Sequence, residues 1–271
     1  TGHYGTDIGE RENIINIDIG GGTTDIFYFQ CSTANPTGYI ASCMFAGDDI
    51  WGNGVRTLGG MANGIVKSCF DKIKKDQENN DPHDQEGYRS LLTNCERLSS
   101  SDVSSMLFKH DKRFSYSTIL KNDNQVKSIL LVHYAAIIYY LSELLQKYEL
   151  SIPHVISFTG KGSEYIKIFA FDVDRIEKIT KALLHTFCAE QEKNHIAKLK
   201  IKRVDNPKEI TSNGGVLADK TVGEGRFDLY PENPLFTVGT GKKEKKALLN
   251  KEVVNNMEIK NEILENFDRF I

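Results

Sequence analysis

A run of small and acidic residues near the start of the chain has the composition of an anion-binding turn. The segment Asp18-Ile19-Gly20-Gly21-Gly22-Thr23-Thr24-Asp25 lies between two strand-like runs. Three successive glycines leave the backbone amides unshielded and free to adopt positive φ, so the turn can present several N–H donors to phosphate oxygens. The carboxylate of Asp18 would repel such an anion unless a cation lay between them. We therefore expect magnesium beside Asp18.

Other chemistries find less support in the residue pattern. A ligand-free hairpin is the alternative for the glycine segment, but an ordinary two-residue turn would close a hairpin at lower entropic cost. The histidines, among them His133, lack metal-ligand spacing, and a scattered histidine is more often a surface or helix-packing residue. Neither a nucleophile elbow nor a serine–histidine pair is recognisable. Phosphate binding is the chemistry that the sequence favours.

Further segments place glycine and other small or polar residues at the ends of expected strands and helices. Phe45-Ala46-Gly47-Asp48-Asp49 follows a third strand, and Phe158-Thr159-Gly160-Lys161-Gly162-Ser163 follows a fourth. Asn206-Pro207-Lys208-Glu209 precedes Asn213-Gly214-Gly215-Val216-Leu217-Ala218, whose small residues allow close packing of a helix. A weaker candidate is Cys95-Glu96-Arg97-Leu98-Ser99-Ser100-Ser101.

Taken together and in this order, the segments resemble the nucleotide-binding motifs of the actin, sugar-kinase and seventy-kilodalton heat-shock chaperone superfamily. The resemblance is closest to the chaperones and to bacterial actin-like proteins, and it covers residues 14–218. It implies ATP and magnesium as cofactors. It also implies that Asp18 is the catalytic residue that orients magnesium-bound water, that Gly20, Gly21 and Gly22 bind the β- and γ-phosphates, and that Thr23 lies near the γ-phosphate.

The resemblance also assigns nucleotide contacts outside the three glycines. The segments supply Thr24, Asp25, Gly47, Asp48, Glu96, Gly160, Lys161, Gly162 and Ser163. Gly162 and Ser163 match the adenosine motif, although a plain strand-to-helix turn is the alternative for them. Lys161 stands where the motif usually has glycine, so either the purine sits differently or the ammonium approaches a phosphate. In the segment that resembles the family's adenine-contacting helix, only Glu96 matches a residue expected to contact the nucleotide. The alternative is that this segment is simply the end of a surface helix.

The resemblance implies a partner that the segments do not provide. Members of the superfamily bind ATP between two similar halves, and the sequence has no second glycine hairpin before Asp18. Gly5-Thr6-Asp7 has too little chain in front of it to form a half-domain. The chain opens on Thr1, so we expect it to be the C-terminal half of the nucleotide-binding domain of a longer protein, with the N-terminal half as its partner.

The pattern of apolar residues predicts an α/β fold that would position these segments. Strands are expected near residues 13–19, 25–30, 39–45, 154–158 and 198–204. One helix is expected after the Gly47-Asp48-Asp49 loop, ending near residue 75, and others near 124–148, 175–193 and 207–219. Three consecutive strands followed by alternating helices and strands are the order of a ribonuclease-H-like mixed sheet with helices on its faces. We expect the half-domain to comprise residues 1–75 and 122–221, with an insertion forming a small subdomain at 76–121 and a charged extension or linker at 222–271.

Composition excludes several partners. The formal charge of −3, from 34 basic and 37 acidic side chains, provides no field of one sign that would attract nucleic acid. The five cysteines have neither a disulfide nor a zinc-ligand pattern, which favours a cytoplasmic location. Polar residues interrupt the apolar run at 129–145, so no membrane span is expected. No signal peptide is visible.

The expected function is nucleotide-dependent closure of the domain by an actin-like or chaperone-like ATPase, with the isolated chain inactive. One alternative is an actin-like filament or scaffold subunit with little turnover, which would use the same site and could form a homo-oligomer. Another is a phosphotransferase relative, against which the Thr24-Asp25 ending argues, because those relatives commonly end the turn in serine or threonine followed by glutamate. A protein client is a further possible partner.

Overall fold

The chain folds around a mixed five-stranded sheet. The computed structural model describes residues 13–30, 37–52, 63–78, 86–170, 172–188 and 192–203. The strand order is β3-β2-β1-β4-β5, with β1 antiparallel to β2, β2 antiparallel to β3, and β1, β4 and β5 parallel. The bounds are β1 Ile14–Ile19, β2 Thr24–Gln30, β3 Thr37–Cys43, β4 Val155–Thr159 and β5 Lys200–Arg203. The expected α/β class, with three antiparallel strands followed by parallel ones, is confirmed.

The two faces of the sheet differ in burial. Alternate residues of β1, namely Ile15, Ile17 and Ile19, are fully buried, because successive side chains of a strand point to opposite faces. On the other face, Phe27 of β2 pairs with Ile40 of β3, and these side chains remain 42% and 36% exposed. The hydrophobic core therefore lies on the isoleucine face of β1.

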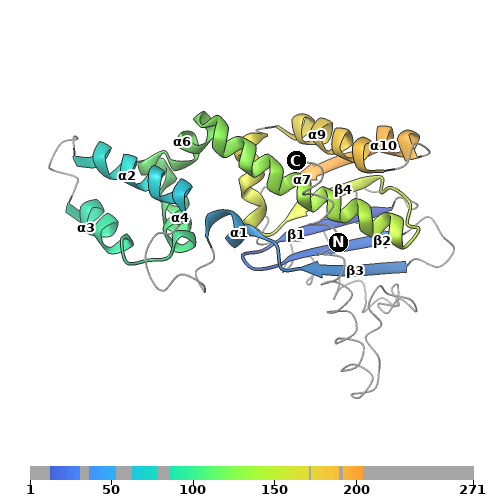
Figure 1. Ribbon diagram of the computed structural model, residues 1–271, viewed down its shortest axis with the longest axis horizontal. Coiled ribbons are helices and arrows are strands. Elements are labelled where there is room, and N and C mark those ends of the chain that lie inside the picture. Colours follow the sequence, from blue (N-terminus) through green and yellow to red (C-terminus); the bar gives the residue numbers. More distant parts are fainter. Residues whose placement is uncertain are drawn as a thin grey trace, which may run out of the picture.

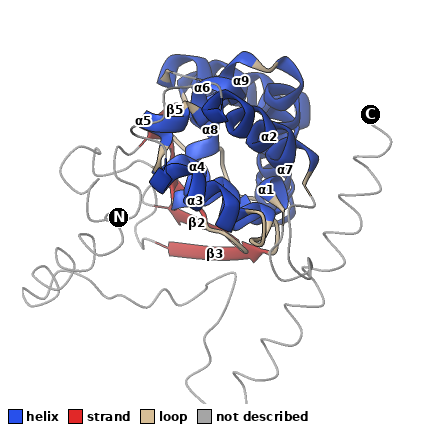
Figure 2. Cartoon of the chain, turned by 90° about the vertical axis from the view of Figure 1, so that its left-hand side faces the viewer, coloured by secondary structure: helices blue, strands red, loops and turns tan. Residues whose placement is uncertain are grey.

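Two long helices cover the buried face. Helices α7 (Asn124–Lys147) and α9 (Val173–Phe187) lie side by side on it (Figures 1 and 2). Asp123 accepts hydrogen bonds from the amides of Gln125 and Val126 at the start of α7, which satisfies donors that a helix leaves unpaired. By length and composition alone α7 could cross a membrane, and 56% of its most apolar window is buried within the protein.

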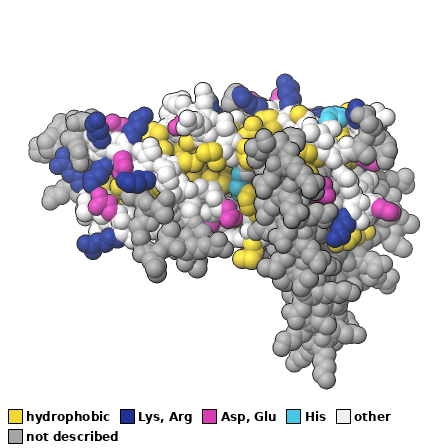
Figure 3. Space-filling view, viewed as in Figure 1, with side chains coloured by type: hydrophobic (Ala, Val, Ile, Leu, Met, Phe, Trp, Pro, Cys, Tyr) yellow, Lys and Arg dark blue, Asp and Glu magenta, His cyan; other side chains and the backbone are white. Residues whose placement is uncertain are grey.

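One apolar face of α7 is buried along only half of its length. Tyr140 and Leu144 lie in the core, whereas Ile129 and Val132 at the other end of that face are 48% and 47% exposed. Figure 3 shows hydrophobic side chains gathered on this side of the molecule. Because α7 is apolar on more than one face, helical periodicity alone does not identify which of its faces is buried.

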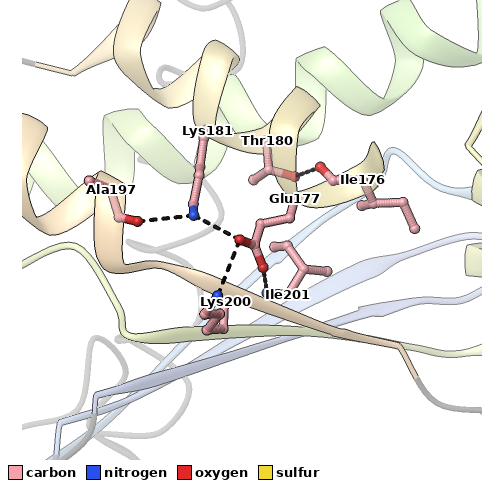
Figure 4. A network of polar contacts seen from close by, with 7 residues as sticks. All are labelled: Ile176, Glu177, Thr180, Lys181, Ala197, Lys200 and Ile201. Atoms are coloured by element: carbon pink, nitrogen blue, oxygen red, sulfur yellow. Dashed lines mark hydrogen bonds and ion pairs between the residues drawn. The ribbon is translucent and has the colours of Figure 1, made fainter. Parts of the chain in front are cut away.

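A polar network fixes the short helix α10 (Lys193–Lys198) and the strand β5 against α9 (Figure 4). Glu177 accepts a hydrogen bond from Lys181 at 2.7 Å and one from the amide of Ile201 at 3.3 Å. Lys181 also donates to the carbonyl of Ala197 at 3.0 Å. Burial by itself would raise the pKa of Glu177, but the hydrogen bonds and the charges of Lys181 and Lys200 outweigh it and lower the pKa.

A group of short helices lies to one side of the sheet, left in Figure 1, and we call residues 63–78 and 86–122 the helical group. Its helices are α2 Gly64–Glu78, α3 Glu86–Cys95, α4 Ser100–Lys109, α5 Asp111–Phe114 and α6 Tyr116–Asn122. Helix α1 (Gly47–Trp51) joins it to the sheet through Trp51, whose ring lies 5.5 Å from Phe108 and 6.3 Å from Tyr116. The insertion expected at residues 76–121 is helical over most of its described length.

Several element boundaries also differ from expectation. The helix predicted to run to residue 75 is two helices, α1 and α2, and the one predicted over 175–193 ends at Phe187, where α9 stops. After β4 the chain forms a 3-10 helix, η2 (Lys161–Tyr165), and the short α8 (Ile166–Phe169). The helix predicted at 207–219, with its Asn213 to Ala218 motif, and the extension at 222–271 lie outside the described residues.

Candidate functional site

Glycine segments that are far apart in the sequence meet at one edge of the sheet. Because β1 and β4 are parallel, with Asp18 beside Thr159, the chain leaves both strands at the same edge. A Cβ atom on Gly162 would lie 2.4 Å from the carbonyl oxygen of Gly20, and one on Gly47 would lie 3.0 Å from the same oxygen. The glycine turn, residues 20–23, is thus enclosed on one side by two loops; a side chain at Gly162 would collide with it, and one at Gly47 would be tight.

Backbone hydrogen bonds orient the glycine turn. The amides of Gly47 and Asp48, at the start of α1, donate to the carbonyls of Gly20 (3.1 Å) and Gly21 (2.8 Å). The described residues contain no cis peptide bond, and in a trans peptide the N–H points opposite to the C=O. With the carbonyls of Gly20 and Gly21 turned toward α1, the amides of Gly21 and Gly22 point away from it.

Those amides are free to bind a ligand. Gly21 and Gly22 are exposed, and neither N–H has an acceptor among the residues that the structure describes. A Cβ on Gly22 would meet nothing within 4 Å. Adjacent N–H groups that point the same way form an anion-binding concavity. The turn therefore presents bare donors, although its glycines do not adopt the positive φ that the sequence analysis allowed, since among the described glycines only Gly52 and Gly160 do.

Two carboxylates face each other beside the turn. Asp18 at the end of β1 is directly opposite Asp25 of β2, and Asp25 accepts a 2.5 Å hydrogen bond from the hydroxyl of Ser42. Burial, followed by the charge of Asp25, raises the pKa of Asp18, although a hydrogen bond with Thr159 works in the opposite direction. Ionised Asp18 is therefore destabilised in the folded chain. Oxygen ligands of this kind suit a hard divalent cation, which would relieve the repulsion.

Asp48 joins the turn to the helical group. Its carboxylate would lie 3.3 Å from a Cβ on Gly21, and it accepts a 2.7 Å hydrogen bond from the hydroxyl of Ser101 in α4. The segment 95–101 therefore reaches the site through Ser101. Glu96, the residue assigned to the nucleotide, instead pairs with Lys74 of α2 at 2.5 Å and is exposed.

Other side chains predicted to contact the nucleotide make hydrogen bonds within the protein instead. Thr24 is buried and donates to the carbonyl of Phe45 at 2.6 Å, which ties β2 to the loop before α1. The hydroxyl of Ser163 donates to the carbonyl of Gly160 at 2.7 Å and closes its own turn. Lys161 is exposed, with no ion-pair partner in the described part of the chain. Of the side chains of Thr24, Ser163 and Lys161, that of Lys161 is free to approach a ligand. Thr23 is also exposed, and its hydroxyl makes only a long 3.5 Å contact with Asp25.

The sequence analysis favoured a surface or helix-packing position for His133, and the structure places it at the junction of the site loops. This histidine of α7 is 7% exposed and stacks on Phe45, with ring centroids 4.3 Å apart. Burial lowers its pKa from 6.5 to about 4, so the ring is neutral near pH 7. The available signal was a polar side chain within the most apolar helix, because a buried polar group requires partners.

The fold and the site define an α/β protein whose glycine-lined loops converge at the carboxyl edge of a mixed sheet. No known protein-family model matches the chain, and comparison with curated proteins found no similar sequence. The function of the glycine turn is therefore inferred from its own geometry and chemistry.

Proposed function

We propose that this chain is a ribonuclease-H-like half-domain, with an inserted subdomain at residues 76–121 within the helical group, that binds the phosphates of MgATP in an actin-like or chaperone-like ATPase. The observation that carries the proposal is the orientation of the glycine turn. Two adjacent amides, of Gly21 and Gly22, point away from α1 and lack acceptors among the described residues. Donors held in this way bind the oxygens of a polyphosphate at little cost in reorganisation.

The neighbouring carboxylates support a cation together with the anion. Asp18 and Asp25 repel each other across the β1–β2 pair, and the pKa of Asp18 is raised by burial and by that repulsion. Magnesium, when bound, would neutralise charge on both the carboxylates and the phosphates. Asp18 would then accept a hydrogen bond from a water molecule and orient it for attack. A partner half-domain would close over the nucleotide.

The link from Gly21 to the helical group supports coupling to domain movement. The amide of Asp48 donates to Gly21, and its carboxylate accepts from Ser101 at the start of α4. A ligand that shifts the turn would therefore shift α1 and α4 with it. Differential contacts of this kind are what a nucleotide needs to bias a conformational equilibrium.

Gly22→Val tests the binding site directly. A Cβ atom at this position meets nothing within 4 Å, so the fold should persist while the valine methyl groups obstruct the exposed amides. We expect isothermal titration of the full chain with MgATP, and separately with inorganic tripolyphosphate, to show weak binding that the variant reduces at least about tenfold. Gly64→Val, at another glycine with open space, is the matched control. Equal affinity in the wild type and Gly22→Val, or no binding by the wild type, would refute the proposal.

Asp18→Asn should separate stability from function. A carboxyl whose folded-state pKa is raised contributes stability that is lost as pH rises through that pKa, so ionised Asp18 destabilises the fold at pH 7. The neutral amide removes this repulsion. We expect urea denaturation to show a more stable variant, and titration to show that magnesium no longer strengthens ATP binding. A less stable variant would contradict the electrostatic interpretation of the facing carboxylates.

A further inference from the structure

The imidazole of His133 joins the two loops that hold the glycine turn. Its Nε2 atom lies 3.2 Å from the carbonyl oxygen of Ala46, and its Nδ1 atom lies 3.0 Å from the hydroxyl of Tyr165. A carbonyl can only accept, so Nε2 carries the proton and donates to it. In the neutral ring Nδ1 is then an acceptor, and the Tyr165 hydroxyl donates to it. One imidazole thus connects the loop before α1 to the end of η2.

The first connection reaches the turn through a single peptide group. The Ala46–Gly47 peptide accepts from His133 at its carbonyl and donates from its N–H to the carbonyl of Gly20 at 3.1 Å. Because a peptide group is planar, fixing the direction of its carbonyl also fixes the direction of its N–H. The carbonyl of Gly20 belongs to the planar Gly20–Gly21 peptide group, which also contains the N–H of Gly21. The orientation of His133 is therefore transmitted to the first ligand-facing amide.

The second connection reaches the same carbonyl from η2. Tyr165 ends η2, and Gly162 near its start is so close that a Cβ atom would lie 2.4 Å from the Gly20 oxygen. A displacement of η2 would push Gly162 into Gly20 or open a gap beside it. By holding Tyr165 as well as Ala46, His133 controls both walls that enclose the Gly20 carbonyl.

A purely structural role would not require this side chain. His133 stacks on Phe45 with the rings 20° from parallel, and phenylalanine could fill the same space. What phenylalanine cannot supply is a donor and an acceptor on opposite sides of one ring. The adjacent Tyr134 offers a comparison, because it is also buried and makes a 2.6 Å hydrogen bond, but to Thr180 of α9 and away from the turn.

We infer that His133 is a positioning residue, which sets the direction of the Gly21 and Gly22 amides and thereby the affinity of the turn for polyphosphate. The inference rests on the proposed function of the glycine turn. The ligand class is a magnesium-bound polyphosphate chain, either free or as part of a nucleoside triphosphate, because His133 acts on the amides that would bind phosphate oxygens.

The test compares His133→Phe with Tyr134→Phe in the full chain. Each removes buried polar contacts of α7 at neighbouring positions, but only the first acts on Ala46. We expect His133→Phe to weaken binding of MgATP and of magnesium tripolyphosphate about tenfold, and Tyr134→Phe to leave both unchanged. His133→Gln, which retains a donor for Ala46, should recover most of the affinity. Loss of ATP affinity alone would show that His133 acts on the nucleoside and would overturn the inference.

A second readout requires no ligand. In amide NMR spectra of the free protein, His133→Phe should shift the resonances of Gly21, Gly22 and Gly47, whereas Tyr134→Phe should not. Unmoved resonances would refute the positioning role even if affinity fell. If the wild type bound no polyphosphate, the proposed function would fail, while these spectra would still decide whether His133 orients the turn. Should His133→Phe not fold, Tyr165→Phe removes one anchor alone and is expected to shift the same resonances.

Discussion

Gly160→Ala is expected to lower the free energy of unfolding by about 3 kcal/mol and to abolish binding of magnesium polyphosphate. Gly160 has φ +78°, a region that side chains rarely adopt. Its added Cβ atom would lie 2.2 Å from Oδ1 of Asp18 and 2.3 Å from the carbonyl oxygen of Ile19. Because the second of these is backbone, the collision cannot be relieved by a change of rotamer. The strand end that carries Asp18 must move.

Gly87→Ala is the matched control for this substitution. Gly87 lies in α3, and a Cβ there meets nothing within 4 Å, so alanine should stabilise the helix slightly through its higher propensity. Urea denaturation monitored by Trp51, the single tryptophan, gives the free energies, and titration calorimetry gives the affinities. If Gly160→Ala kept the stability and the ligand affinity of the wild type, the close contact between the β4 loop and Asp18 would not exist in solution.

The strands and the long core helix could be predicted from the sequence because their signals are local. The isoleucine run of β1 and the long apolar α7 were located to within a residue or two. Within the helical group, α2 lay largely in the helix predicted up to residue 75, whereas α3 to α6 were not predicted because they are short and polar. Helices of four to ten residues, such as α5 and α3, are marginal alone and depend on the aromatic packing around Trp51.

The glycine turn was located by composition, but its orientation could not be. Three adjacent glycines indicate accessible amides, whereas the direction of those amides depends on Gly47 and Asp48, which lie more than twenty residues away. The contact from Ser101 and the two hydrogen bonds of His133 are likewise long-range. Each depends on the path of helices that local patterns do not specify. Predicted ligand residues such as Thr24 proved to have structural partners for the same reason.

Acidification is expected to destabilise the fold through His133. Burial lowers the pKa of this histidine from 6.5 to about 4. Between those values the unfolded chain binds a proton on His133 that the folded chain excludes, so stability falls as pH decreases. The contribution is fully present above pH 6.5 and is lost by about pH 4. At about 1.4 kcal/mol for each pKa unit, the loss amounts to roughly 3 kcal/mol.

The contribution of His133 can be isolated by subtraction. Other groups also contribute to the pH dependence of stability, among them Asp18, whose pKa is raised, and Glu177, whose pKa is lowered. These groups are common to the wild type and His133→Gln, so their contributions cancel in the difference between the two. The wild-type advantage in free energy of unfolding, measured in urea with Trp51 fluorescence, should be constant above pH 7 and shrink steadily toward pH 4.5. An advantage independent of pH would mean that the ring keeps its ordinary pKa in the folded state and is therefore solvated. An advantage that grew as pH fell would mean that the folded ring is charged; a charged imidazole has only donors, so Nδ1 could not accept from Tyr165.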